Sequence, residues 1–596
     1  MHLNIRHFFT LSLLLLAVCA GMAAPARPGK IAYRQPDGTV INVSLHGDEH
    51  LHYYLSEDGF VLLPDGKRVL RYAEVSSDGN VLPTGLAAHG QNARSAQETE
   101  YVKAIDRTPI IESLTREYVV KRKAKAYVDG AGMPGEVERT FPTTGEIHGI
   151  IILAEFTDKK FSRDDISDIY NNMANEENYS GEYSSGSIRD YFVAQSGGKF
   201  VPSFDIVGPV ELPHETSYYA RDEVAIDLMI DACKAADANA GVDFSKYDYN
   251  GDGMVDFVFV IYAGYGQAQG GGGDTVWPQS VDLTYYSWDT YDGLYLSQSA
   301  CSSELRGSTG EMIDGIGTFC HEFSHILGLP DIYDPVYSGM QGMLTWDVMD
   351  VGLYNDDSRT PAGYTAMDKY TVGWLEPVVL DKPATGLTLN PLSETNEAYF
   401  IVCGTDRNEY YTLENRQQTG WDKGLGGHGL IVSHIHYDKS IWASNHVNTT
   451  SSGYEHVALV PADNIASQGT EDGDPFPGVS GNTQFTDTSL PAAFWHTTAA
   501  AVDCPITNIR EENGVITFDF KAESTGIGAV EGGVKPCVSV AGGLVSVENP
   551  EGLDVCISSA DGRIVARSKF KTVECRPGSG VYIVSCGDIV QKIVVK

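Results

Sequence analysis

Residues 321–334 read HEFSHILGLPDIYD and carry the side chains best suited to chemistry. In a helix, positions four apart lie on one face, so His321 and His325 can direct two imidazoles at one metal ion. Glu322 is offset by one residue, which lets its carboxylate reach a water on that metal without joining the ligands. Zinc takes nitrogen and carboxylate ligands and keeps one position open for water in catalytic sites. The spacing therefore predicts a zinc-dependent hydrolytic site.

The residues after the second histidine strengthen this prediction. Gly328 can end the helix in a left-handed turn, and Pro330 prevents its continuation. The chain then turns back, so Asp331 can supply a third ligand. Two neutral imidazoles and one carboxylate leave the site with a net positive charge, which acidifies a bound water. The alternative is a helix with two hydrogen-bonded histidines, but the later glycine and aspartate favour the metal.

Cys320 and Met349 are expected to pack in the protein interior instead of binding the metal. Cys320 points about 100° away from the face that carries the histidines, so we predict a buried helix residue. TWDVMDVG at 345–352 places Met349 in a tight apolar turn, and an isolated methionine usually belongs to a core. His434 and His436 share one strand face and could hold a second metal, but a structural strand is the favoured interpretation.

A calcium loop is predicted in the segment DYNGDGMVD. Its oxygen-bearing side chains occupy the first, third, fifth and ninth positions of such a loop: Asp248, Asn250, Asp252 and Asp256. Gly253 at the sixth position allows the sharp turn. The twelfth position is Phe259 instead of glutamate, so this is not a complete EF-hand, and an ion-free Asp/Gly-rich turn is the alternative.

Strand and helix patterns around these motifs predict an α/β domain over residues 141–384. Two continuous apolar runs, HGIIILAEF at 148–156 and FVFVIYAGYG at 257–266, are typical of buried strands. Helical spacing appears in GSIRDYFVAQSGGKF at 186–200 and in DEVAIDLMIDACKAADAN at 222–239. The helix that carries the two histidines is expected to begin near Ile313.

The rest of the chain is expected to form further domains, because a chain of 596 residues is too long to fold around a single hydrophobic core. Residues 385–523 are predicted to be β-rich. Residues 533–596 contain short strands separated by turns, which fits a small β-sandwich. Residues 25–140 show short strands with Asp-Gly turns, then a charged helical stretch that ends in the basic run KRKAKAY.

The N-terminus has the features of an export signal. Arg6 gives a positive start, Phe8–Val18 an apolar run, and small residues up to Ala24 a cleavage region, so residues 1–24 are predicted to be a signal peptide. The apolar run is too short for a membrane span, and no other segment suits one. We expect a secreted or cell-surface protein. Residues 25–140 are then predicted to be a pro-segment released by cleavage near the basic run, with a permanent N-terminal domain as the alternative.

Charge and cysteine content narrow the function further. The formal net charge is -38, and residues 141–596 hold 26 basic and 64 acidic side chains. Nucleic acid is excluded as a partner, because phosphate binding needs a basic surface. Nine cysteines remain beyond Cys19, without a CxxC pair, so a cysteine zinc cluster is not expected. Export permits disulfides, whose pairing the sequence does not determine.

Seven segments in order resemble the immune inhibitor A family of secreted bacterial zinc metallopeptidases: GSIRDYFVAQSGGKF, YDYNGDGMVDFVFVIYAG, HEFSHILGLPDIYD, WDVMD, YTVGWLEP, YYTLENRQQTGWD and DPFPG. HExxHxxGxxD followed by WDxMD is similar to the metzincin arrangement, in which a Met-turn lies beneath the zinc. This resemblance implies endopeptidase activity on proteins, with His321, His325 and Asp331 as ligands and Glu322 as base. Aspartate replaces the commoner third histidine. Tyr354 could assist the oxyanion, with a packing role as the alternative.

The expected fold is a multidomain α+β chain, with a zincin-type α/β catalytic domain followed by a β-rich domain and a small C-terminal β-sandwich. The last segment, ending GVYIVSCGDIVQKIVVK, resembles the sorting domain of type IX secretion substrates, so secretion machinery is a possible partner beside protein or peptide substrates. A plain β adhesion module is the alternative.

The leading hypothesis is a secreted zymogen of a zinc endopeptidase. Its pro-segment contains no cysteine, so a carboxylate, an imidazole or simple steric cover must block the site. A rival hypothesis is a surface adhesin or binding module with a structural zinc, although a structural site has no need of Glu322. Hydrolysis of a non-peptide ester or amide is a third.

Overall fold

The computed structural model describes the following residues: 22–123, 141–221, 225–284, 286–334, 340–445, 447–449, 454–498, 501–521, 537–541, 544–548, 555–559, 564–578, 580–586 and 589–595. The chain divides into two compact units, residues 1–522 and 523–596. Residues 1–21 of the predicted signal and residues 124–140, with most of the basic run, lie outside the described residues. No helix within the described ranges is long and apolar enough to cross a membrane.

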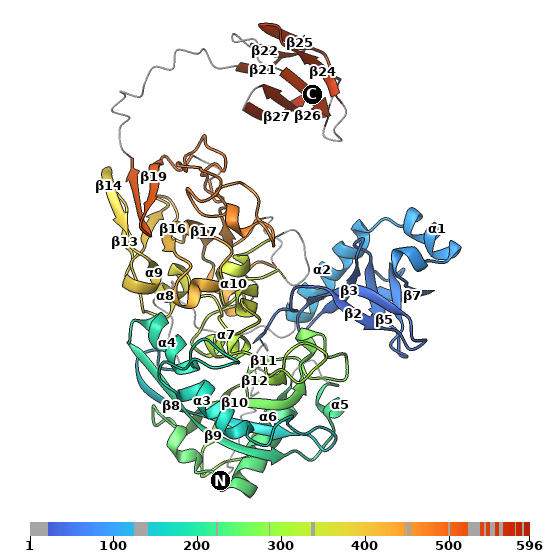
Figure 1. Cartoon of the computed structure of the whole chain (residues 1–596), viewed down its shortest axis with the longest axis vertical. Helices are drawn as coiled ribbons and strands as arrows, with labels where there is room; N and C mark the ends of the chain where they lie inside the picture. Colours follow the sequence, from blue (N-terminus) through green and yellow to red (C-terminus); the bar gives the residue numbers. More distant parts are fainter. Residues whose placement is uncertain are drawn as a thin grey trace, which may run out of the picture. The chain divides into compact units, whose positions relative to one another are not determined.

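A six-stranded sheet forms the centre of the α/β part, in the order β1-β11-β12-β10-β8-β9. Its strands are β1 (Met22–Ala23), β8 (Gly145–Glu155), β9 (Phe200–Glu211), β10 (Met254–Tyr265), β11 (Gln279–Asp282) and β12 (Tyr295–Leu305). The four long strands run parallel to their neighbours, and β11 is antiparallel to β12. β8, β9 and β10 lie side by side in the teal and green part of Figure 1.

Both faces of this sheet are buried, which explains the continuous apolar runs in β8 and β10. Ile151 and Phe259 face one core, which also includes buried residues of α3 (Ile166–Asn175), α4 (Ile188–Ser196) and α7 (Gly317–Ile326). Ile150 and Val258 face a second core with α6 (Ile226–Ala235). The sheet is therefore a rigid platform between helices, and α7 carries the histidines.

Helix α7 begins at Gly317 instead of near Ile313. Ile313 forms an isolated bridge with Leu305, and Asp314 N donates to the Glu304 carbonyl 2.8 Å away, so this stretch extends strand β12 instead of starting the helix. A Cβ at Gly317 would lie 1.9 Å from the Leu353 carbonyl oxygen. Glycine is needed there because the helix starts directly against the segment that follows the Met-turn.

An N-terminal sheet in the order β2-β3-β4-β5-β6-β7 precedes this part of the chain. Its elements are β2 (Ile31–Arg34), β3 (Val40–Gly47), β4 (His52–Ser56), β5 (Val61–Pro64), β6 (Leu70–Val75), β7 (Val81–Ala87), α1 (Ala96–Ala104) and α2 (Thr108–Lys123). Neighbouring strands pair antiparallel, as expected for hairpins closed by Asp-Gly turns.

Two further sheets occupy the region after the α/β part, in the orders β13-β15-β16-β17-β18 and β14-β20-β19. The strands are β13 (Val378–Val379), β14 (Ala384–Leu389), β15 (Tyr399–Val402), β16 (Glu409–Arg416), β17 (Gly429–His436), β18 (Val457–Leu459), β19 (Ile506–Glu512) and β20 (Val515–Phe520). The short helices of the first unit are α5 (Thr216–Tyr219), α8 (Ala366–Thr371), α9 (Leu392–Thr395) and α10 (Lys439–Ala443).

The C-terminal unit consists of two antiparallel sheets around one small core. Its strands are β21 (Cys537–Ala541), β22 (Leu544–Glu548), β23 (Val555–Ser559), β24 (Ile564–Ser568), β25 (Thr572–Cys575), β26 (Gly580–Cys586) and β27 (Ile589–Val595). The predicted mixed α/β class is thus confirmed, while the assignment of each part as a functional domain stays a prediction.

Buried Arg416, in the β-rich part, forms hydrogen bonds to the segment around the Met-turn. Its guanidinium makes two hydrogen bonds to Asp422, at 2.6 and 2.7 Å, and one to Glu414 at 3.0 Å. The remaining two go to the backbone carbonyls of Trp346 and Gly363, at 2.9 and 3.1 Å. All five guanidinium donors are therefore used.

We expect Arg416→Met to destabilise the first unit by about 3–5 kcal/mol, because two buried carboxylates lose their counter-charge. Urea unfolding followed by tryptophan fluorescence would measure the loss. Arg163→Met is the matched control, since the ion pair of Arg163 with Asp165 is exposed and should contribute about 0–1 kcal/mol. Equal unfolding midpoints for the two variants would contradict this role for Arg416.

Candidate metal centre

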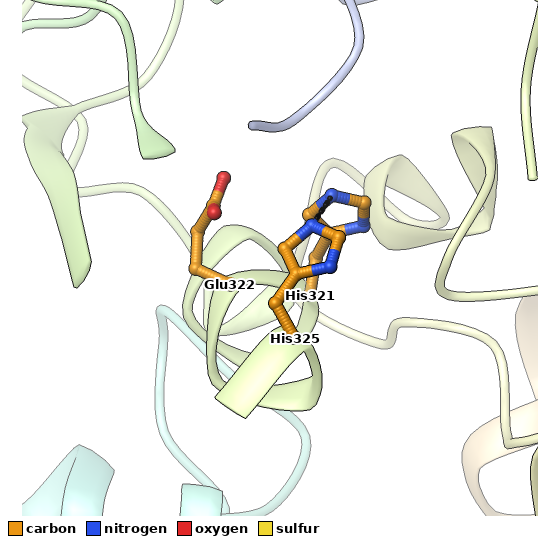
Figure 2. Close-up of side chains that lie close together, drawn as sticks. All are labelled: His321, Glu322 and His325. Carbon is orange, nitrogen blue, oxygen red and sulfur yellow. Dashed lines mark hydrogen bonds between the residues drawn. The ribbon is translucent and has the colours of Figure 1, made fainter. Parts of the chain in front are cut away.

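Three ligand atoms converge on one point above α7. His321 Nε2 lies 3.2 Å from His325 Nε2, and Asp331 Oδ1 lies 3.2 and 3.3 Å from these two nitrogens. Ligands bound tetrahedrally to zinc at about 2.0–2.1 Å are about 3.3 Å apart. Two nitrogens and one carboxylate oxygen at this spacing fit three corners of a zinc site. Figure 2 shows both imidazoles projecting from the same helix, with the Glu322 side chain beside them.

Backbone carbonyls fix the orientation and tautomer of both imidazoles. His321 Nδ1 donates to the Val348 carbonyl and His325 Nδ1 to the Leu329 carbonyl, each at 2.8 Å. A carbonyl only accepts, so both Nδ1 atoms carry the proton and both Nε2 atoms keep a lone pair for a metal. Burial lowers the pKa of His321, which favours the neutral form that a metal requires.

Asp331 is held by a residue far along the chain. Asn445, just after α10, accepts a hydrogen bond from Asp331 N at 2.6 Å, and its side-chain amide donates to Asp331 Oδ2. This leaves Oδ1 directed at the imidazoles. Burial would raise the pKa of Asp331, but the neighbouring His325 and His321 outweigh it and hold that pKa low. Asn445 has no recognisable sequence signal, because only the fold brings it to the site.

Glu322 is fully buried, and its position differs from that of the ligands. It offers a ligand atom within 4.8 Å of both histidines, yet Asp331 lies closer. Its Oε1 accepts a hydrogen bond from Ala24 N at 2.7 Å. Burial and the charge of Asp331 raise the pKa of Glu322 well above its usual value, an effect that a bound cation would oppose. The arrangement fits a base beside the metal better than a fourth ligand.

The predicted Met-turn makes hydrogen bonds to residues of this centre. Met349 is fully buried, and its carbonyl accepts from Ile332 N at 3.0 Å, next to Asp331. Met349 N donates to Asp347 Oδ1 at 2.8 Å. Since Val348 also holds His321, this one turn positions residues on both sides of the metal. Cys320 is buried in α7, as expected from its position on the helix.

The N-terminal segment runs through the centre. Strand β1 forms the edge of the central sheet and pairs antiparallel with β11, Met22 opposite Ser280 and Ala23 opposite Gln279. Three successive carbonyls of the segment are then held by buried side chains. The Ala23 carbonyl accepts from Tyr333 at 2.6 Å, the Ala24 carbonyl from Trp277 at 2.8 Å and the Pro25 carbonyl from Tyr354 at 2.7 Å.

Sequence reasoning singled out Tyr354 but not Tyr333 or Trp277. Tyr354 lies in the short helix Val351–Tyr354, and its hydroxyl contacts the segment rather than bulk solvent. Tyr333 belongs to the same HEFSHILGLPDIYD motif as the ligands, two residues after Asp331. This position within the motif is the sequence signal that could have identified Tyr333.

The predicted calcium loop is a tight turn that precedes β10. Asp248 accepts from the backbone N–H groups of Gly251, Asp252 and Gly253, at 2.8 to 3.1 Å. Asp256 is 7% exposed, and its pKa is raised to about 6 by burial, with added repulsion from Asp252 and Asp248. The crowded carboxylates are compatible with a cation, while the backbone hydrogen bonds already account for the turn.

His434 and His436, both on β17, each contact a polar side chain from another part of the chain. His434 Nε2 lies 2.9 Å from Glu409 Oε1, and His436 Nδ1 lies 2.7 Å from the Tyr454 hydroxyl. These contacts agree with the structural strand that was favoured for this pair.

Comparison with known proteins identifies the family that part of the chain matches. Residues 149–375 match the catalytic domain of the immune inhibitor A peptidases, M6. This region belongs to the M6 peptidase family. The M6 region begins in β8 and includes α7 and the Met-turn, so it contains every ligand atom that converges on the centre.

Two curated relatives of the M6 region are metallopeptidases by name or family. Immune inhibitor A of Bacillus thuringiensis subsp. alesti is 27% identical over 221 residues, which cover 31% of this chain and 31% of the relative. Pre-pro-metalloprotease PrtV of Vibrio cholerae serotype O1 (strain M66-2) is 27% identical over 233 residues, 34% of this chain and 25% of the relative. The chain thus spans a third or less of each relative.

We expect Asn445→Ala to weaken zinc binding about 10- to 100-fold, because Asp331, the predicted third ligand, loses the residue that orients it. Competition with a chromophoric chelator would measure the dissociation constant. Asn172→Ala, an exposed substitution on α3, is the control and should leave the constant unchanged. Equal affinities for both variants would show that Asp331 does not depend on Asn445.

Proposed function

We propose that this chain is a secreted zinc endopeptidase made as a zymogen. The observation that carries the proposal is the set of three ligand atoms at tetrahedral spacing, with a buried glutamate beside them. His321, His325 and Asp331 are the proposed ligands and Glu322 the proposed base. Membership of the M6 family supports a metallopeptidase. Proteins or peptides are the proposed substrates.

The residues of the chain provide the proton transfers that peptide hydrolysis needs. Zinc, when bound, supplies a Lewis acid that polarises a carbonyl and lowers the pKa of water. Glu322 then takes a proton from the attacking water and passes it to the leaving amine. The 2.7 Å contact from Ala24 N to Glu322 Oε1 supports this role, because the carboxylate there meets the nitrogen of an extended peptide.

Latency is proposed to follow from the part of the N-terminal segment that comes after this contact, because that part lies beside the ligands where a substrate would. Pro25 and Arg27 come after the predicted signal and stay anchored without it. Tyr354 donates to Pro25, and the Arg27 guanidinium pairs with Asp357 and donates to Gln269 at 3.1 Å. Backbone that fills the cleft provides the steric cover expected of a pro-segment without cysteine. Cleavage in the linker that follows α2 is the proposed activation step.

Export and sorting belong to the same proposal. Residues 1–24 would direct secretion, and the C-terminal residues 533–596 would engage a type IX secretion system. The separate compact unit after residue 522 supports a module that acts independently of the peptidase.

We expect Glu322→Gln to lower casein cleavage by at least 10³-fold while zinc content stays at the wild-type value. The amide keeps the size of the side chain but cannot accept a proton. Both proteins, expressed from residue 25, would be assayed before and after limited proteolysis of the 121–140 linker, with zinc measured by atomic absorption. Cleavage should come from the processed wild type alone.

Other outcomes assign the site differently. Zinc in both proteins without cleavage by either would favour the adhesin with a structural metal. Cleavage of small esters but not of casein would favour a non-peptide substrate. Full activity of the unprocessed wild type would contradict the zymogen.

We further propose that Ca²⁺ binds the loop 248–256 through Asp248, Asn250, Asp252 and Asp256. If it binds, millimolar calcium should raise the unfolding midpoint of the wild type, and Asp252→Asn should reduce that shift. Scanning calorimetry in calcium and in EGTA measures both. Asp37→Asn, in the N-terminal sheet, is the control. Equal midpoints with and without calcium would leave the loop as an ion-free turn.

A further inference from the structure

One peptide bond of the N-terminal segment is held at both of its polar atoms. The Ala23 carbonyl oxygen accepts a hydrogen bond from the Tyr333 hydroxyl at 2.6 Å, while Ala24 N donates to Glu322 Oε1 at 2.7 Å. Oxygen and nitrogen of the same amide therefore face two different side chains beside the ligands. Both of these side chains, Tyr333 and Glu322, are at most 7% exposed.

The strand pairing makes this segment a guide to how a substrate lies. β1 adds to the open edge of β11, as extended peptides do when main-chain hydrogen bonds provide their affinity. Main-chain contacts do not depend on side-chain identity, so another extended peptide can take the same path. The atom positions of the Ala23–Ala24 bond then mark where the reacting bond of a substrate lies.

The register separates the roles of the three side chains that hold carbonyls. Glu322 faces the nitrogen of Ala24, and the carbonyl of that same amide is the one held by Tyr333. Trp277 holds the next carbonyl and Tyr354 the one after it. Tyr354, the tyrosine expected from the sequence to assist the oxyanion, thus lies two carbonyls away from the bond at Glu322.

We propose that Tyr333 is a catalytic residue, whose hydroxyl donates to the carbonyl oxygen of the scissile bond and stabilises the oxyanion that forms there. Trp277 and Tyr354 hold the substrate on the side of the leaving amine. This inference rests on the proposed peptidase function and names a further group in the same site.

The chemistry balances without a further reactant. Water adds its oxygen to the carbonyl carbon, and the C=O bond becomes a C–O⁻ bond that gains a stronger hydrogen bond from Tyr333. Glu322 accepts one proton of the water and delivers it to the nitrogen, and the C–N bond breaks to give a carboxylic acid and an amine. The acid then gives its proton to the amine, which leaves a carboxylate and an ammonium group. Tyr333 keeps its proton throughout, so its contribution is electrostatic.

Backbone contacts fix Tyr333 relative to the metal. Tyr333 follows Ile332, whose N–H donates to the Met349 carbonyl at 3.0 Å, and Asp331 precedes both. Ligand, anchor and hydroxyl are thus consecutive residues of one rigid stretch. A donor placed in advance costs no reorganisation when charge develops on the oxygen, which is the condition for strong stabilisation.

The test compares the full chain from residue 25 as wild type, Tyr333→Phe, Tyr354→Phe and Glu322→Gln, each after limited proteolysis of the linker. With a fluorogenic peptide, Tyr333→Phe should lower kcat about 10²- to 10³-fold with KM changed less than about threefold. Tyr354→Phe removes an equally buried hydroxyl and should act mainly on KM. Zinc content should be the same in all four.

A second measurement does not depend on turnover. A phosphinic pseudopeptide carries a tetrahedral, charged centre in place of the amide, whereas a product peptide carries none. Tyr333→Phe should weaken binding of the phosphinate about as strongly as it lowers kcat/KM and leave the product affinity unchanged, as measured by fluorescence anisotropy. The ratio of the two affinities is independent of the fraction of correctly folded protein.

The outcomes distinguish this inference from the function on which it rests. Wild-type kcat and phosphinate affinity in Tyr333→Phe, with Glu322→Gln inactive, would overturn the role of Tyr333 and leave the peptidase intact. A loss of phosphinate and product affinity by the same factor would also overturn it, since Tyr333 would then only support the site. If the wild type itself cleaves no peptide, the proposed function fails instead.

Discussion

The site depends on keeping two imidazole nitrogens and a carboxylate oxygen about 3.2–3.3 Å apart. Without a cation, three such acceptors crowded together are unfavourable, so the surrounding protein must impose the spacing. It does so with hydrogen bonds to each of the three residues. The Val348 carbonyl holds His321, the Leu329 carbonyl holds His325 and the Asn445 side chain holds Asp331 through two hydrogen bonds. Three separate stretches of the chain therefore set the spacing.

The second constraint is the open edge of the central sheet. An exposed edge invites another strand, and in this protein Met22 and Ala23, at the end of the predicted signal, take that place. Under the proposed function, an extended substrate would pair with the same edge, so one surface would serve both substrate binding and latency. Tyr333, Trp277 and Tyr354 each donate a hydrogen bond to one of three successive carbonyls, so the segment is bound at defined positions.

Local patterns predicted the parts of the site that are set by local geometry. His321, Glu322 and His325 follow from helical spacing, and the buried strands follow from apolar runs, because both are properties of short segments. Asn445 could not be predicted, since its role needs a contact across 114 residues. The start of α7 was misplaced because Ile313 and Asp314 pair with the end of β12, and these tertiary contacts overrode the helical pattern. Met22 and Ala23 lie within the predicted signal and pair with β11, a contact across 256 residues or more that no local pattern indicates, while the signal itself stays a prediction.

The contact between Asn445 and Asp331 also determines which fragments of the chain can keep an intact site. The family match ends at residue 375, but Asn445 and Arg416, which secure the ligand and the Met-turn segment, both lie beyond it. A fragment cut at that limit would keep the whole zinc motif while its third ligand lost its support. The evolutionary unit and the unit that can fold into a working site are therefore different lengths of the same chain.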